Sequence, residues 1–489
     1  MKAMNRFAVA ALMLACTGPM FAQDPVAVVS QPAQPSAQET SEEIRLLRSR
    51  LDQLETQQKE TARKAEATRT TEQVIQDANR RSQMLEVGAF SAGHKDGRFF
   101  IGSEDGNFNL RPILQLQFRD VTVMRRGFKP GGDDDIQNGF EIRRAKFGFD
   151  GNAFTPDFTY FFLWATARAS GTSNVNNAAG TKIGTTSNNL GGVPLLEEAW
   201  VKYRFENTPF YIKGGGIKDP LLHDQIVSSR YQQSTERSLI ADIFANGDAF
   251  TEGATFIFDP KTWVRTEAGV THGLRSADTN FLDYPNTNAF NYGAAGRAEF
   301  KVMGNWKDYS QIGAVGTKEP LLVIGVGGDY SERGHAGQTV GVVDAMYADQ
   351  HGLSVYGAVV DRYTNHNFGL YTQSAVGASI TAPPASVLNT PTNEYGMMLQ
   401  AGYLFNQHLE PFGRYEYMHL KGNVAGTHGA FSALTAGANY YFYGHSAKVT
   451  AQVTYLPNGS PIDDTANDIL AMPSAKSEFS GVVQFQLSI

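Results

Sequence analysis

The chain has 489 residues, and 19% of them are charged. Its formal net charge is −7 and its mean hydropathy is −0.30. It contains 49 Gly, 31 Phe and 20 Tyr but only one Cys. This composition suits strands with aromatic girdles better than a leucine-rich helical core. Beyond the N-terminal region no run of about 18 or more apolar residues occurs, which excludes a membrane-spanning helix there. A membrane form of this chain would therefore have to cross the bilayer with strands.

The N-terminus has the pattern of an export signal. Lys2 and Arg6 supply the positive region, residues 7 to 16 supply the apolar stretch, and the position after Ala22 is suitable for cleavage. We therefore expect a signal peptide at residues 1 to 22 and a mature chain without cysteine. Lipidation of Cys16 is the alternative, although the three residues before it form a poor lipobox.

Two segments follow the signal peptide. Residues 23 to 40 are rich in Pro, Gln, Ala and Ser without an apolar period, which predicts a flexible linker. Residues 41 to 97 are expected to be helical and periplasmic, because apolar residues recur at heptad spacing near their start. The seam is too short to be stable alone, so a trimeric coiled-coil stalk and a single solvated helix both remain open. The seam residues are Ile44, Leu47, Leu51 and Leu54.

From about residue 98 the apolar period changes to two, and the runs have the length of tilted membrane strands. An even number of strands, sixteen, can be counted, which predicts an all-β fold, a 16-stranded antiparallel transmembrane barrel over residues 98 to 489. The expected strands are 109 to 124, 139 to 151, 158 to 169, 195 to 206, 209 to 217, 248 to 259, 262 to 273, 291 to 303, 321 to 330, 339 to 349, 353 to 363, 394 to 404, 408 to 420, 430 to 443, 446 to 456 and 478 to 489.

The connections between these runs alternate between short and long. Outer-membrane barrels have short periplasmic turns and long external loops, so the alternation supports the strand count. Residues 304 to 320 break the rule, because this connection should be a short turn. We therefore expect one strand boundary beside it to be wrong.

The last expected strand shows the alternation that a barrel needs. Val483, Phe485 and Leu487 alternate with Gln484 and Gln486 up to the end of the chain. In a soluble two-sheet protein the apolar set would form the core. An apolar alternation at the C-terminus instead favours the membrane barrel, in which the apolar set faces lipid.

Four segments resemble the phosphate-selective porin O and P family, and the resemblance extends over about residues 98 to 489. They are EIRRAKFGFDG at 141 to 151, LEEAWVKYRF at 196 to 205, GGGIKDP at 214 to 220 and STERSLIADIF at 234 to 244. The resemblance implies a 16-stranded outer-membrane porin that is trimeric and prefers anions, often with an N-terminal coiled-coil extension. It also implies that an arginine ladder guides anions through the lumen.

In trimeric porins of this type the third external loop folds into the lumen, and here that loop is residues 218 to 247. Cationic side chains in a constriction favour anions. The candidate pore-lining residues from the wall and from this loop are Arg111, Arg119, Arg144, Lys146, Lys202, Arg204, Lys218, Arg230 and Arg237. The alternation along later strands predicts that Arg297, Lys301 and Arg414 also face the lumen.

Acidic residues make a second interpretation equally open. The inward loop has three Lys or Arg residues against four acidic residues, namely Asp219, Asp224, Glu236 and Asp242. The wall has acidic residues on the same face as its cations, so the charges could form a transverse field as in any general porin. Phosphate selectivity would need a lysine cluster in the loop, which this loop lacks.

We expect passive diffusion of small hydrophilic solutes, with a mild preference for anions such as oxyanions, and no catalytic residue, cofactor or metal. The alternatives are a structural tether that uses the N-terminal helix and a saccharide porin. A saccharide porin would need aromatic rings along the lumen, whereas five tyrosines are expected mostly on the outer girdle: Tyr415, Tyr417, Tyr440, Tyr441 and Tyr443. Expected partners are two further copies in a homotrimer, outer-membrane lipid and lipopolysaccharide, the solutes and the cell wall, but not nucleic acid.

Overall fold

The computed structural model describes residues 45–61, 63–64, 72, 75, 90–95, 98–126, 135–166, 172–176, 182–187, 194–245, 250–274, 292–333, 336–365, 391–421, 429–459, 469 and 477–489. These residues fall into two compact units, Met1–Val87 and Gly88–Ile489. The expected signal peptide at residues 1 to 22, including Cys16, and the expected linker at residues 23 to 40 lie outside the described part.

The first unit contains an α-helix over residues 45–61, as the heptad spacing predicts. Leu47, Leu51 and Leu54 are exposed on this helix, while Ile44 lies outside the described residues. In a single copy of the chain the apolar seam is therefore uncovered, and the trimeric stalk stays a prediction. None of the helices described here combines the length and the apolar character needed to cross a membrane.

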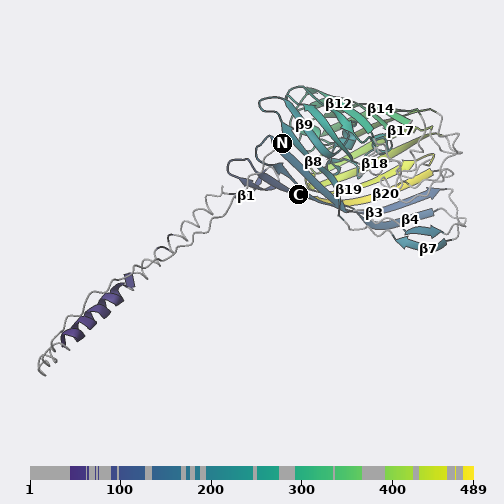
Figure 1. The fold of residues 1–489 in the computed structure, drawn as a ribbon. Helices are drawn as coiled ribbons and strands as arrows, with labels where there is room; N and C mark the ends of the chain where they lie inside the picture. Colours follow the sequence, from purple (N-terminus) through teal and green to yellow (C-terminus); the bar gives the residue numbers. More distant parts are fainter. Residues whose placement is uncertain are drawn as a thin grey trace, which may run out of the picture. The chain divides into compact units, whose positions relative to one another are not determined.

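The second unit is a closed antiparallel barrel (Figure 1). Each of the sixteen expected strands is present, with its ends shifted by only a few residues. Pairing of the last strand with the first closes the wall. The wall strands are β3 (Asn109–Arg126), β4 (Asp135–Asn152), β5 (Phe158–Thr166), β8 (Pro194–Arg204), β9 (Phe210–Ile217), β10 (Thr251–Phe258), β11 (Val264–Thr271), β12 (Tyr292–Met303), β13 (Leu321–Arg333), β14 (Ala336–Ala348), β15 (Leu353–Thr364), β16 (Thr392–Tyr403), β17 (Leu409–His419), β18 (Ala430–Tyr443), β19 (Ala447–Leu456) and β20 (Ser477–Ser488).

Four shorter strands were not predicted. β1 (Phe90–Lys95) and β2 (Arg98–Ser103) form a hairpin, and β2 also pairs with the start of β3. The expectation of a helical segment over residues 41 to 97 is therefore wrong for Phe90–Lys95, which pairs as a strand. β6 (Thr172–Asn176) and β7 (Lys182–Ser187) form a separate hairpin in the long connection between β5 and β8.

Burial in the wall is inverted relative to a soluble protein. On β16, Leu399 is 57% exposed, whereas its neighbour Gln400 is only 3% exposed. The same alternation of exposed apolar and buried side chains recurs on β15 and β17. Apolar residues on the outside can be stable only against lipid, so the pattern excludes the soluble two-sheet alternative.

The connection between β9 and β10 folds into the lumen and has an apolar core. We call residues 218–245 the inward loop; it contains α2 (His223–Ile226), η1 (Ser229–Tyr231) and α3 (Leu239–Ala245). Leu221, Ile240 and Phe244 of this loop are fully buried among inward side chains of β13 to β18, such as Val340 and Met418. The loop is therefore packed on one side of the barrel, as the hydrophobic effect requires of these residues.

The long connection between β12 and β13 also folds inward. We call residues 304–320 the turn segment; its short helix is η2 (Asp308–Ser310). Tyr309, Ile312 and Ala314 join the apolar core, and the backbone N–H of Ile312 donates to the carbonyl oxygen of Tyr231 at 3.0 Å. Our expectation of a wrong strand boundary is therefore incorrect, because the extra length packs beneath the inward loop.

A glycine on β13 tests how closely the inward loop is packed. A Cβ on Gly327 would lie 2.2 Å from the carbonyl oxygen of Leu221. We expect Gly327→Val to push the loop towards the opposite wall, to lower the single-channel conductance and to cost about 1–3 kcal/mol of unfolding free energy. The measurements are planar-bilayer recording and urea unfolding.

Gly341 on β14 provides the control, because a Cβ there meets no atom within 4 Å. We expect Gly341→Val to keep the wild-type conductance. Equal conductance in the Gly327→Val variant would show that the loop is not held against β13.

Candidate pore constriction

Cationic side chains of the wall fix the backbone of the inward loop. Each donates a hydrogen bond to a loop carbonyl oxygen, at distances from 2.5 to 3.1 Å. The pairs are Arg297 with Leu221, Lys448 with Gln232, Arg414 with Glu236, and Arg362 with Ile243. Three of these cations are themselves neutralised by wall carboxylates, Arg297 by Asp344, Arg362 by Glu394 and Arg414 by Glu416. These groups therefore hold the loop in place, and their hydrogen bonds to the loop take the place of contacts with a solute.

Glu236 of the inward loop binds three arginines at once. Its carboxylate oxygens lie 2.8 Å from Arg119, 2.6 Å from Arg143 and 2.6 Å from Arg144. The register shifts between Gln117 and Phe118, so one extra residue on β4 bulges opposite β3. The bulge directs Arg143 and Arg144 to the same carboxylate, which strict alternation would forbid.

Other acidic residues of the inward loop also lack exposure to the lumen. Asp224 is buried and accepts hydrogen bonds from the backbone N–H and hydroxyl of Ser238, at 2.9 and 2.6 Å. Asp219 is buried too, and burial together with the nearby Asp329 raises its pKa well above the usual value. The count of loop charges from sequence therefore overstates the negative charge that a solute meets.

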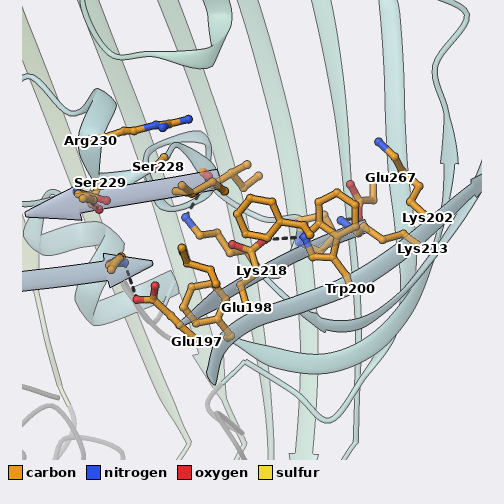
Figure 2. Close-up of a pocket in the computed structure, with 18 of the residues that line it drawn as sticks. Glu197, Glu198, Trp200, Lys202, Lys213, Lys218, Ser228, Ser229, Arg230 and Glu267 are labelled. Carbon is orange, nitrogen blue, oxygen red and sulfur yellow. Dashed lines mark hydrogen bonds and ion pairs between the residues drawn. The ribbon is translucent and has the colours of Figure 1, made fainter. Parts of the chain in front are cut away.

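A cavity of about 290 Å³ lies between the inward loop and the wall strands β3 to β11. Figure 2 shows side chains from the loop and from the wall converging on it. Six cationic and three acidic side chains line the cavity. The cationic ones are Lys146, Lys202, Lys213, Lys218, Arg230 and Arg237, and the acidic ones are Glu197, Glu198 and Glu267.

Each of the three carboxylates has a polar partner in the cavity wall. Lys146 lies 2.6 Å from Glu197, and Lys213 forms an ion pair with Glu267. Glu198 accepts a hydrogen bond of 2.8 Å from the indole N–H of Trp200 (Figure 2). Glu197 and Glu267 are therefore neutralised by lysines, whereas Glu198 keeps its negative charge and is stabilised by a neutral donor.

Lys202 and Arg230 are cations of the cavity that form no ion pair with a described carboxylate. Within the part of the chain that the structure describes, neither Lys202 nor Arg230 has a carboxylate within 4.0 Å. Lys202 lies on β8, and Arg230 lies in the inward loop on the other side of the cavity. Their charges face the lumen across the space that a solute would occupy.

The sequence candidates divide into three groups by position. Five of them line the cavity: Lys146, Lys202, Lys218, Arg230 and Arg237. Four make ion pairs with Glu236, Glu416 or wall carboxylates that position the loop: Arg119, Arg144, Arg297 and Arg414. Three lie elsewhere: Arg111 pairs with Asp150, Arg204 pairs with Asp157 next to a short turn, and Lys301 lies over the ring of Trp306.

Sequence reasoning missed several residues of the constriction. Arg143 and Glu197 were missed because each lies at a bulge that breaks the alternation. Lys213 and Trp200 could have been found, since they lie at alternating positions on strands that were predicted. Tyr441 was expected on the outer girdle, but it is fully buried and donates a 2.5 Å hydrogen bond to Glu410.

Two histidines contact the turn segment, His223 from the inward loop, which is buried, and His445 from the turn between β18 and β19, which is half-buried. The ring of His223 stacks on Tyr309 with centroids 3.8 Å apart, and His445 contacts Gln311 at 2.7 Å. Burial and the neighbouring Arg297 hold the pKa of His223 well below its usual value of 6.5. Burial and Lys448 hold the pKa of His445 below the same value.

The histidines predict that acid destabilises the folded protein. Below about pH 6.5 the unfolded chain takes up protons on these rings while the folded chain does not, so the unfolding free energy falls as pH falls. We expect the melting temperature to drop between pH 7.5 and about pH 5.5. The double variant His223→Gln, His445→Gln should flatten this drop, whereas replacing the exposed His351 with Gln should leave it unchanged. An unaltered slope in the double variant would contradict the prediction.

The arginine cluster predicts a large effect of one isosteric change. In Glu236→Gln, three guanidinium groups lose their shared carboxylate, and we expect a loss of about 3–5 kcal/mol in the free energy of unfolding. The same substitution at the exposed Glu319 provides the control and should change stability little. Urea unfolding followed by tryptophan fluorescence measures both. Equal stability of the two variants would mean that Glu236 does not hold the loop.

The family model described as phosphate-selective porin O and P matches residues 119–472, well over half of the chain. No curated protein matches the chain. Similar solved structures include an anion-selective porin from Comamonas acidovorans (9% identity, 78% of this chain and 99% of that chain, TM-score 0.47). Others are OmpF of Salmonella typhi (13%, 79% and 99%, TM-score 0.45) and the channel DcaP of Acinetobacter baumannii (8%, 79% and 99%, TM-score 0.45). By the family model, this outer-membrane channel belongs to the phosphate-selective porin O and P family.

Proposed function

We propose that the protein is a passive channel for small hydrophilic solutes that prefers anions. The observation that carries the proposal is the cavity between the inward loop and β3 to β11, where six cations face three carboxylates. In a narrow, partly dehydrated passage an excess of fixed positive charge raises the local concentration of anions.

The position of the acidic residues supports the preference further. Glu236 is paired with arginines, and Asp224 is buried and hydrogen-bonded to Ser238, so neither carboxylate is exposed to the cavity. Lys146 and Lys213 each form an ion pair with a carboxylate inside the cavity, so these charges largely cancel. The net field along the passage then includes the charges of Lys202, on β8, and Arg230, in the inward loop.

The residues favour a broad anion preference over strict selection of phosphate. A phosphate filter would need several lysines in the inward loop, but Lys218 is the only lysine in residues 218–245. Its ammonium group already donates to the carbonyl oxygens of Gln225 and Ile226 at 3.1 and 3.2 Å. Phosphate is one permeant oxyanion among several in this proposal.

The proposal includes a homotrimer in the outer membrane, with the N-terminal segment in the periplasm. The exposed leucines of helix 45–61 would pack between three copies. The short turns, which are periplasmic in outer-membrane barrels, lie at the same end of the wall as the start of β3, where the N-terminal segment joins the barrel. A purified protein that inserts into bilayers but passes no current would favour the structural tether instead.

The two unpaired cations predict a change in selectivity. In the double variant Lys202→Gln, Arg230→Gln we expect the permeability ratio of chloride to potassium to fall, by at most about fivefold for each charge if one charge contributes about 1 kcal/mol. The measurement is the reversal potential across a planar bilayer in a potassium chloride gradient.

The double variant Arg48→Gln, Lys59→Gln is the matched control, because it removes one Arg and one Lys from the exposed N-terminal helix. Its reversal potential should equal that of the wild type. If the cavity variant also kept the wild-type value, the cavity could not be the selective region.

A further inference from the structure

Eight of the 20 side chains that line the cavity described above are apolar, which an inorganic anion filter does not need. Three aromatic rings line it, from Phe161 on β5, Trp200 on β8 and Phe250 after the inward loop. Aliphatic side chains complete the apolar part: Ile113, Leu163, Pro220, Ile226 and Ile257. All three rings are partly exposed, so a solute can reach them.

Two of the rings are held in a fixed orientation. Phe161 and Trp200 lie side by side across β5 and β8, with centroids 5.5 Å apart and planes inclined by only 8°. The hydrogen bond from the indole N–H to Glu198 fixes the plane of Trp200. The cavity therefore presents a preformed aromatic surface, which saves the entropy of ordering side chains on binding.

An ammonium group lies next to the aromatic surface at two places. The Nζ atom of Lys202 is 5.6 Å from the ring centroid of Trp200, and that of Lys218 is 5.8 Å from the ring centroid of Phe250. Arg230 adds a third cation, and Figure 2 shows it with Lys218 and Trp200 around the same space. A solute that spans this space meets a flat apolar surface and positive charge together.

We propose that this cavity is a binding subsite for small aromatic carboxylates during their passage through the channel. The proposal rests on the anion preference proposed above and names a class of anion. The carboxylate pairs with Lys202 or Arg230 while the ring packs on Trp200, Phe161 or Phe250. A volume of about 290 Å³ lies at the lower limit for ligand pockets and suits a molecule with one ring.

The apolar surface distinguishes this class from other solutes. Inorganic phosphate and acetate can use the cations but gain little from the rings. Neutral sugars can stack on the rings but gain nothing from three excess cations. Only an anion with a flat apolar body uses both parts of the cavity.

Block of chloride current by added solutes tests the subsite in the full-length protein. Benzoate, acetate, inorganic phosphate and glucose are each titrated on the same side of a planar bilayer. We expect benzoate to reach half-block at a concentration about threefold to tenfold below that of acetate, which is the range that one stacked aromatic contact supplies. Glucose should not block at these concentrations.

Two variants locate the effect in the cavity. We expect Trp200→Leu and Phe250→Leu each to remove most of the difference between the half-blocking concentrations of benzoate and acetate. Trp263→Leu is the control, because Trp263 is exposed in a short turn away from the cavity. It should keep the benzoate preference of the wild type.

The outcomes separate this inference from the anion preference. Equal block by benzoate and acetate in a channel that still selects chloride over potassium would overturn the subsite and leave the proposed function intact. A wild-type channel that does not favour chloride over potassium would overturn the proposed function itself. Stronger block by glucose than by benzoate would overturn the subsite in favour of a saccharide channel.

Discussion

The structure depends on the attachment of the inward loop to one half of the barrel wall. Apolar residues of α3 and of the loop start pack on inward side chains of β13 to β18, and wall cations bind the loop carbonyl oxygens. A loop of this length carries many backbone groups that would be costly to bury without partners. The arginines of the wall satisfy part of this need, so the lumen on that side is filled and the passage is confined to the other side.

Because the loop is attached in this way, only some of the charged side chains in the lumen are available to a solute. An arginine on the inner face can bind a solute or bind the loop, and Arg297, Arg362 and Arg414 do the latter. The acidic residues of the loop are used in the same way, with Glu236 among three arginines. Selectivity then depends on the charges that remain near the cavity, among them Lys202 and Arg230, because the paired charges largely cancel each other's field.

The barrel itself could be predicted from the sequence, because the alternation of apolar and polar residues follows directly from lipid on one side and lumen on the other. All sixteen strands were found in this way. The bulges at Arg143 and Glu197 could not be found, since a bulge shifts the alternation by one residue without a marker in composition. The inward fold of residues 304–320 was also missed, because the length of a connection does not reveal which surface it packs on. Charge counts failed for the loop since they do not show which carboxylates are buried against arginines.

The central claim is that the passage left open by the inward loop carries an excess of unpaired positive charge. The reversal potential of the wild-type channel in a potassium chloride gradient tests this claim most directly. We predict a potential with the sign of chloride permeation, which weakens at high ionic strength as the fixed charges are screened. A potential with the sign of potassium permeation would contradict the account, because the pairing of charges described for the lumen could not produce it.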